Sequence, residues 1–171
     1  RHKGIEVACL RLGSTYGPGK KTATHSGYAS LKTSIVEAAA EGRDILVRGR
    51  DLVDDVVYNR DVAKAFVCAA TSEATTWSGH VYNVSGGVLV SISEFAAEVQ
   101  RCCPDISVEF VEDDRPAASG QRIHMDISAA ERDLGFVPDW PGTRGVSDYL
   151  SVASRRAPTE NAGADRLELV I

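Results

Sequence analysis

The sequence lacks the patterns that mark several large classes of protein. Its cysteines show no Cys-x-x-Cys spacing, and none of its four histidines stands at metal-ligand spacing from a second ligand. We therefore expect no metal site, and reduced thiols at Cys9, Cys68, Cys102 and Cys103. The longest apolar runs, such as residues 5–10 with Glu6 inside, are far too short to cross a bilayer.

An excess of positive charge is also missing. Lys and Arg number 19 against 24 Asp and Glu, which gives a net charge of −5. This balance argues against a nucleic-acid binder. The segment Arg1 to Gly4 does not have the pattern of a signal peptide. We expect a cytoplasmic protein that binds neither nucleic acid nor membrane.

What is present is an ordinary globular composition, 43% hydrophobic and 25% charged over 171 residues, enough for one domain with a core. Strand-like and helix-like segments alternate. Strands are predicted at residues 5–12, 44–47, 53–58, 80–84 and 107–111, and helices at 27–41, 60–72, 92–102, 128–134 and 143–154. Alternation of this kind predicts an α/β fold with some parallel sheet, although the strands are few.

Local signals add detail to this pattern. Ser91 with Glu94, and Ser128 with Glu131, have the spacing of capping boxes at the starts of two helices. Residues 14–21 are predicted to be a turn-rich loop. Residues 156–171 are predicted to be a flexible tail.

The segment "GYASLK" places Tyr28 and Lys32 four residues apart, on one face of a predicted helix. There an ammonium group can lower the pKa of a phenol, and the phenolate can take a proton from a sugar alcohol. This pair is one candidate for a catalytic site. The other interpretation is that both are ordinary residues of that helix.

Four stretches, in this order, resemble a known family. They are "VACLRLGSTYGPG" (residues 7–19), "DDVVYNRDVAKAF" (54–66), "VYNVSGGVLVSISEFAAEV" (81–99) and "MDISAAERDLGFVP" (125–138). Together they are similar to the C-terminal portion of an extended short-chain dehydrogenase/reductase, in the NAD-dependent epimerase/dehydratase family. The resemblance implies a partial Rossmann-like parallel sheet plus the small C-terminal substrate-binding subdomain over residues 1–155, with the N-terminal dinucleotide-binding half absent.

The same resemblance bears on Tyr28 and Lys32. In the family the catalytic Tyr-x-x-x-Lys precedes the stretch that resembles residues 7–19, whereas here the pair follows it. We therefore expect no catalytic residue in this chain, and no glycine-rich turn for the cofactor pyrophosphate. A rearranged reductase site built on Tyr28 and Lys32 remains a weaker alternative.

The resemblance also implies binding residues. Those expected to border the cofactor, NAD or NADP, are Leu12, Gly13, Tyr16 and Pro18. Those expected to contact the substrate are Ser14, Arg48, Arg50 and Arg115. An arginine suits this task because its planar fork matches phosphate oxygens.

Asp54 is a departure from the family pattern. Enzymes that act on uridine or thymidine sugars usually carry an arginine at this position, and a carboxylate repels a phosphate instead of gripping it. Arg48 or Arg50 is one possible compensation. The alternative is a substrate without a nucleotide, such as a free sugar acid or another small carbonyl or alcohol.

The function that the resemblance implies is the substrate-binding portion of an NAD(P)-dependent sugar or nucleotide-sugar epimerase, dehydratase or dehydrogenase. The intact protein would be a homodimer, and the 171-residue chain alone would be inactive. The alternative is a catalytically inactive relative that acts as a ligand- or partner-binding module.

Overall fold

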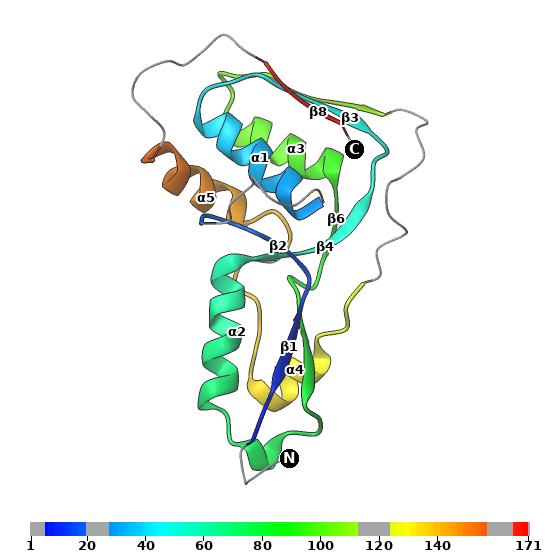
Figure 1. The fold of residues 1–171 in the computed structure, drawn as a ribbon, viewed down its shortest axis with the longest axis vertical. Helices are drawn as coiled ribbons and strands as arrows, with labels where there is room; N and C mark the ends of the chain where they lie inside the picture. Colours follow the sequence, from blue (N-terminus) through cyan, green and yellow to red (C-terminus); the bar gives the residue numbers. More distant parts are fainter. Residues whose placement is uncertain (1–5, 20–27, 113–123, 157–165, 171) are drawn as a thin grey trace.

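The computed structural model describes residues 6–19, 28–112, 124–156 and 166–170, with the side chains of residues 28–30 excepted. Two lobes lie one above the other in Figure 1, joined by a set of short strands. The strand-pair lobe comprises β1 (Cys9–Leu12), α2 (Asn59–Thr71), η1 (Ala74–Thr76), β5 (Val81–Val84) and α4 (Ser128–Leu134). The helix-rich lobe comprises α1 (Tyr28–Ala40), β3 (Ile45–Gly49), α3 (Ile92–Cys102), β7 (Val108–Glu112), α5 (Gly145–Ser154) and β8 (Leu167–Val170). The junction comprises β2 (Ser14–Tyr16), β4 (Val53–Tyr58) and β6 (Leu89–Ser91).

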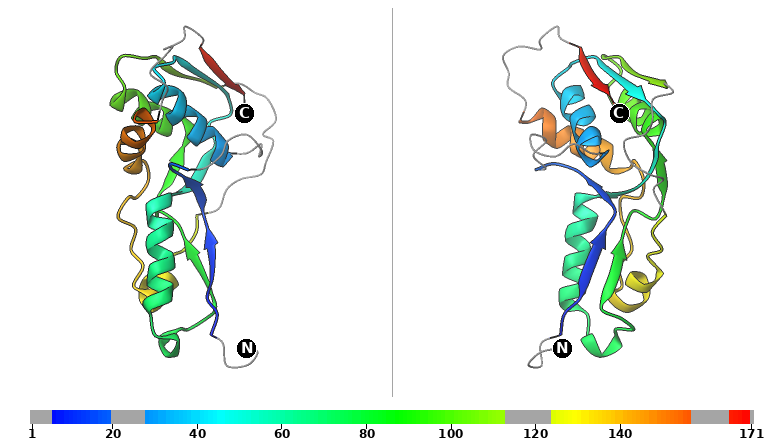
Figure 2. Two further views of the ribbon diagram at one scale, coloured as in Figure 1. Left: turned by 60° about the vertical axis from the view of Figure 1, so that its left-hand side comes forward. Right: turned by 45° about the vertical axis from the view of Figure 1, so that its right-hand side comes forward.

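In the strand-pair lobe, β1 and β5 run parallel in a two-stranded sheet, with Leu12 paired to Val84. The left view of Figure 2 shows α2 and α4 on the same side of these strands. Side chains alternate between the two faces of a strand, so Tyr82 and Val84 are buried beneath the helices whereas Val81 is exposed. The second face of the pair is therefore uncovered among the described residues.

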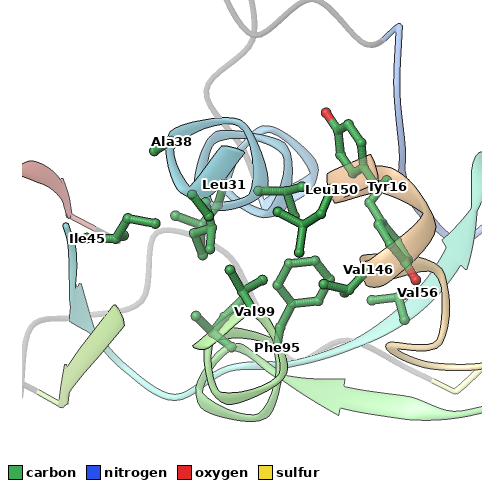
Figure 3. Close-up of a cluster of buried hydrophobic side chains, with 14 of the residues drawn as sticks. Tyr16, Leu31, Ala38, Ile45, Val56, Phe95, Val99, Val146 and Leu150 are labelled. Atoms are coloured by element: carbon green, nitrogen blue, oxygen red, sulfur yellow. The ribbon is translucent and has the colours of Figure 1, made fainter. Parts of the chain in front are cut away.

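In the helix-rich lobe, β3 lies between β7 and β8 in a parallel sheet, and α1, α3 and α5 pack beneath it (Figure 1). Figure 3 shows the core between these helices, where Phe95 of α3 faces Leu150 and Val146 of α5. The Phe95 ring also meets the ring of Tyr16 edge-on, with 5.3 Å between the centroids. The core thus joins the helices to the junction.

The junction lets the chain pass between the lobes. Strand β2 runs parallel to β4, and β6 runs antiparallel to β4 on its other side. A Cβ at Gly13 would lie 2.7 Å from the Asp55 carbonyl oxygen, and one at Gly86 would lie 2.5 Å from the Val56 carbonyl oxygen. Both crossings bring backbone against backbone so closely that only glycine fits.

The predicted α/β class with a partial parallel sheet is confirmed. The capping box of Ser91 and Glu94 is also confirmed, since both of its hydrogen bonds are present. The second predicted box is wrong. Ser128 is the first residue of α4 and gives no side-chain cap; instead Asp126 accepts a hydrogen bond from the Ser128 backbone N–H over 2.9 Å.

Two segments predicted to be irregular form strands. Residues 14–16 of the predicted loop form β2, because they pair with residues 56–58 of β4. Residues 167–170 of the predicted tail form β8, because Leu167 and Leu169 pack onto the core of the helix-rich lobe. Residues 157–165 and 171 of that tail lie outside the described residues.

Candidate functional site

The carboxyl ends of β1 and β5 mark the candidate site. In open α/β sheets, ligands bind beside the carboxyl ends of parallel strands. Here β1 ends at Leu12 and β5 at Val84, and the Gly13 N–H donates to the Val84 carbonyl over 2.8 Å. A Cβ at Gly13 would also touch Ser85, at 3.5 Å. The two strand ends therefore meet at the start of the junction.

Strand β4 brings two carboxylates to this place. Asp54 and Asp55 are consecutive, so they point to opposite faces of the strand, and both are almost fully buried. Buried carboxylates require partners, because an unpaired charge inside a protein is costly. Each of the two has its own set of partners.

Asp54 points toward α1, where its Oδ2 lies 3.0 Å from Nζ of Lys32. Both side chains are closed to solvent, at 0% exposure for Lys32 and 3% for Asp54. Two opposite charges so close form a pair without net charge. Lys32 thus forms a buried ion pair with Asp54. Its predicted catalytic partner was Tyr28, whose side chain lies outside the described residues.

Asp55 points the other way, toward the turn after β5 and the chain before α4. The Ser85 hydroxyl donates to its Oδ1, the Met125 backbone N–H donates to Oδ2 over 2.6 Å, and Nδ1 of His124 lies 3.1 Å from Oδ2. Burial raises the pKa of Asp55, and the Met125 N–H and the His124 imidazole act in the opposite direction. This cluster ties three distant segments together at the strand ends.

Sequence reasoning did not single out Asp55, Ser85 or His124 as site residues. The Asp-Asp pair on a strand was a usable signal for Asp55, since one of two adjacent strand residues points to each face. Nothing local marks His124 as its partner, because the contact exists only when residues 124–125 pass beside β4 and β5.

The predicted binding residues near the strand ends differ in how far their side chains are exposed. Leu12 is 39% exposed, and Gly13 and Ser14 follow it directly into the junction. Tyr16 has no exposed surface; its hydroxyl donates to the Gly142 carbonyl over 2.9 Å and accepts from the Gly145 N–H. Burial raises the pKa of the Tyr16 phenol, so this side chain serves the core, and only its backbone can border a ligand.

Pro18, like Tyr16, can border a ligand through its backbone. Its carbonyl accepts a hydrogen bond from Nδ2 of Asn59 over 2.7 Å. A Cβ at Gly17 would lie 2.4 Å from the Asn59 side chain, and Gly17 has φ +137°, which favours glycine. This contact fixes the turn after β2 against the start of α2.

The two predicted arginines that the structure describes, Arg48 and Arg50, do not lie with Leu12, Gly13 and Ser14. Arg48 lies on β3 in the helix-rich lobe, where its Nε donates to Oε1 of Glu168 on β8 over 3.0 Å. Arg50 is exposed just after β3. Arg115 lies outside the described residues. Of the candidate substrate residues, the structure thus places Ser14 alone at the strand ends.

Other site types were also considered in the described ranges. No group of three or more His, Cys, Asp and Glu side chains is placed there to hold a metal ion. All four cysteines carry free thiols. No helix in the described part of the chain is long and apolar enough to span a bilayer.

Comparison with known proteins starts from the sequence. The model of the NAD-dependent epimerase/dehydratase family matches residues 1–85. This range runs from the first strand through β4 and α2 to Ser85, and so includes both carboxylates of β4 and the ends of β1 and β5. Among curated proteins, no significant match is found.

Solved structures share the fold. UDP-glucose 4-epimerase from Thermotoga maritima, solved with UDP-glucose, superposes with a TM-score of 0.72 at 20% identity, over 91% of this chain and 48% of its own. RMD from Pseudomonas aeruginosa, solved with NADPH, gives 0.72 at 23% identity over 90% and 49%. A monomeric L-threonine 3-dehydrogenase from a metagenome gives 0.74 at 15% identity over 91% and 50%.

The chain thus spans about half of the length of the solved proteins it matches. The fold they share is Rossmann-like, as the sequence predicted. The NADPH held by RMD, and the NAD held by a matching UDP-glucose 4-epimerase from Thermus thermophilus, agree with the predicted cofactor class. Residues 1–85 thus match the NAD-dependent epimerase/dehydratase family, and the fold of the chain agrees with that of a portion of such a protein.

Proposed function

We propose that this chain is the substrate-binding portion of an NAD(P)-dependent epimerase, dehydratase or dehydrogenase that acts on a sugar or a nucleotide sugar. The observation that carries the proposal is the family match, which ends at Ser85, where the strand ends meet. Solved structures with the same fold include one that holds UDP-glucuronic acid and NAD. In this arrangement residues 1–155 form the C-terminal part of the domain.

The residues at the strand ends fit the border of such a ligand. Gly13 carries no side chain, and Leu12 offers exposed apolar surface next to it. The backbone at Pro18 is held in place by Asn59. NAD(P), when bound, supplies the capacity to accept and return a hydride. No glycine-rich turn for the pyrophosphate occurs in the sequence, so the groups that hold most of the cofactor belong to the dinucleotide-binding half that we propose precedes this chain.

A small alcohol is the second candidate substrate. Asp54 stands where enzymes of nucleotide sugars are expected to carry an arginine, and it is paired with Lys32 inside the protein. Two of the similar structures are L-threonine 3-dehydrogenases. A substrate without phosphates would need no arginine at this position.

The experiment is a turnover assay on the longer protein that we propose contains this chain. NAD⁺ or NADP⁺ would be supplied with UDP-glucose, UDP-glucuronic acid or L-threonine, while nicotinamide absorbance and sugar configuration are followed. We expect turnover of one of the two UDP-sugars, and no turnover by residues 1–171 alone. Activity on L-threonine alone would favour the second candidate, and no activity at all would favour an inactive, ligand-binding relative.

We also propose that the intact protein is a cytoplasmic homodimer. Free thiols at all four cysteines suit a reducing compartment. The exposed apolar residues Val7 and Val81 lie on the uncovered face of the strand pair, which further sheet or helix of the intact protein would cover. Light scattering of the longer protein would report a dimer mass.

A further inference from the structure

The imidazole of His124 lies at the candidate site and belongs to neither hydrophobic core. It is 51% exposed, and its Nδ1 lies 3.1 Å from the buried Oδ2 of Asp55. A carboxylate only accepts hydrogen bonds, so Nδ1 carries the proton in the neutral ring, and Nε2 is left as an acceptor. No described residue hydrogen-bonds Nε2. A buried carboxylate therefore fixes the tautomer and the orientation of a half-exposed ring.

The His124 ring is held, through Asp55, close to the carboxyl ends of β1 and β5. The carboxylate that holds His124 also accepts from the Ser85 hydroxyl, and the Asp55 carbonyl oxygen lies 2.7 Å from where a Gly13 Cβ would be. On the far side, the next residue, Met125, donates its backbone N–H to the same carboxylate. Asp55 thus holds His124 beside the residues at which β1 and β5 end.

The charges around the ring favour a neutral partner. Among the described residues, the carboxylates of Asp55 and Asp126 lie close enough to the imidazole for it to act on their pKa values; burial still raises the pKa of Asp55, and Arg132 also lies near Asp126. Asp54, on the same strand, is neutralised by Lys32. An anionic ligand at Nε2 would approach these two carboxylates, whereas a hydroxyl group can donate to Nε2 without such repulsion.

We infer that His124, held by Asp55, binds a hydroxyl group of the substrate through its Nε2 atom. The inference rests on the proposed function, since it assigns a contact within the same site. The group that His124 binds is a hydroxyl of a sugar or of a small alcohol, and not a phosphate. Asp55 is in this account a positioning residue, because it acts through the ring.

Two amide variants separate the two nitrogens of the ring. In His124→Asn the amide can reach Asp55 as Nδ1 does, but nothing remains at the position of Nε2. In His124→Gln the amide reaches toward the position of Nε2. The longer protein is assayed with NAD⁺ or NADP⁺ and with whichever of UDP-glucose, UDP-glucuronic acid and L-threonine is turned over. We expect His124→Asn to raise KM about 10-fold, the usual effect of one lost hydrogen bond. Its kcat and thermal midpoint should stay close to wild type, and His124→Gln should recover part of the KM.

An unchanged KM in His124→Asn, with turnover intact in the wild-type protein, would overturn the inference and leave the proposed function standing. A wild-type protein that turns over none of UDP-glucose, UDP-glucuronic acid and L-threonine would remove the proposed function, and the inference with it. A large fall in the thermal midpoint of His124→Asn would overturn the inference as well, because it would show a structural role.

Nitrogen NMR of the imidazole distinguishes the hydroxyl from an anion. The His124 signals are assigned by their loss in His124→Asn. We expect the Nε2 signal of the longer protein to shift when the substrate is added, and to stay in place when inorganic pyrophosphate is added. A shift with pyrophosphate of the same size would assign the ring to an anion and contradict the inference.

Discussion

The helix-rich lobe and the strand-pair lobe carry different sets of side chains on the uncovered faces of their sheets. The outer face of the β7-β3-β8 sheet carries two ion pairs. Arg48 of β3 pairs with Glu168 of the neighbouring β8, and Arg166, just before β8, pairs with Glu109 of β7 on the other side of β3.

The uncovered face of the strand pair carries Val7 and Val81, which are more than half exposed, beside the hydrogen-bonded Arg11 and Asn83. Val170 on the outer face of the larger sheet is similarly exposed, but it stands next to the ion pairs. Charged pairs suit contact with water, whereas exposed apolar residues suit contact with protein.

The hydrophobic cores of the two lobes also differ, in the number of elements that enclose them. The core of the helix-rich lobe is enclosed by α1, α3 and α5 and reaches Tyr16 and Val56 in the junction. The core of the strand-pair lobe lies only between the strands and the two helices α2 and α4. Among the described residues, the core of the helix-rich lobe is thus enclosed by more elements than the core of the strand-pair lobe. This difference supports the proposal that more of the sheet adjoins β1 in a longer protein.

The largest expected effect comes from the enclosed core. Phe95→Ala removes a fully buried ring that touches Tyr16 and the helices around it, and we expect the free energy of unfolding to fall by about 4 kcal/mol. Urea unfolding of the two proteins measures it. Phe66→Ala on α2 is the matched control; that ring is 56% exposed, so the loss should stay below about 0.5 kcal/mol. Equal losses would contradict the difference between the lobes.

The buried ion pair between α1 and β4 should rank next. Lys32→Met removes the cation of a buried ion pair and keeps the Asp54 carboxylate inside the protein, so we expect the free energy of unfolding to fall by about 3 kcal/mol in urea unfolding. The double variant Lys32→Met with Asp54→Leu should recover most of that loss, because neither charge of the pair remains.

Lys64→Met is the control for this pair. Lys64 lies 2.6 Å from Asp139, but both side chains are partly exposed, so the change should cost less than about 1 kcal/mol. If Lys32→Met were as mild as Lys64→Met, water would reach the Lys32–Asp54 pair and the buried arrangement would be refuted.

Removal of β8 tests whether the last strand completes the helix-rich lobe. A chain that ends at Asp165 loses Leu167 and Leu169, which pack half-buried on the core, and we expect a loss of about 2 kcal/mol from the apolar surface alone. Glu168→Ala keeps the strand and removes only the ion pair with Arg48, so its effect should be below about 1 kcal/mol. No difference between the truncated chain and the parent would show that β8 contributes nothing.

The smallest expected effect concerns acid stability in the strand-pair lobe. Ser78 donates to the Asp133 carboxylate through its backbone N–H and its hydroxyl, and with Arg132 this holds the pKa of Asp133 at about 2. An ordinary aspartate in an unfolded chain has a pKa of about 3.9. The unfolded chain therefore takes up the proton first, and the stabilisation is present above about pH 4 and is lost as the pH falls toward 2.

Asp133→Asn should remove this part of the acid sensitivity. The measurement is the urea midpoint from pH 5 to pH 2 for the parent and the variant, with the exposed Asp105→Asn as control. The parent should lose stability more steeply than Asp133→Asn in this range, and Asp105→Asn should follow the parent. Parallel curves for the parent and Asp133→Asn would refute the depressed pKa.

Much of the fold follows from patterns that are local in the sequence. The helix from residue 28 is predicted from its apolar stripe, and the capping box of Ser91 and Glu94 marks the start of α3. Strand β4 appears at the predicted residues 53–58. Neighbouring residues decide such features, so the sequence reveals them directly.

Edge strands were missed for the opposite reason. Residues 14–16 and 167–170 are short, and their strand character exists only through pairing with β4 and β3. The N-cap of α4 was assigned to Ser128, whereas Asp126 accepts the hydrogen bond, two residues earlier. The choice between two nearby polar caps depends on how the chain enters the helix.

For the candidate site, the sequence alone determined the family match over residues 1–85 and the α/β class, and it predicted the segment at Leu12, Gly13 and Ser14, because these follow from motifs that are contiguous in the chain. Only the tertiary structure decided which charges meet. Lys32 is bound by Asp54, and Asp55 holds His124, since adjacent residues on a strand point to opposite faces and each carboxylate takes the cation that packing brings to its own side.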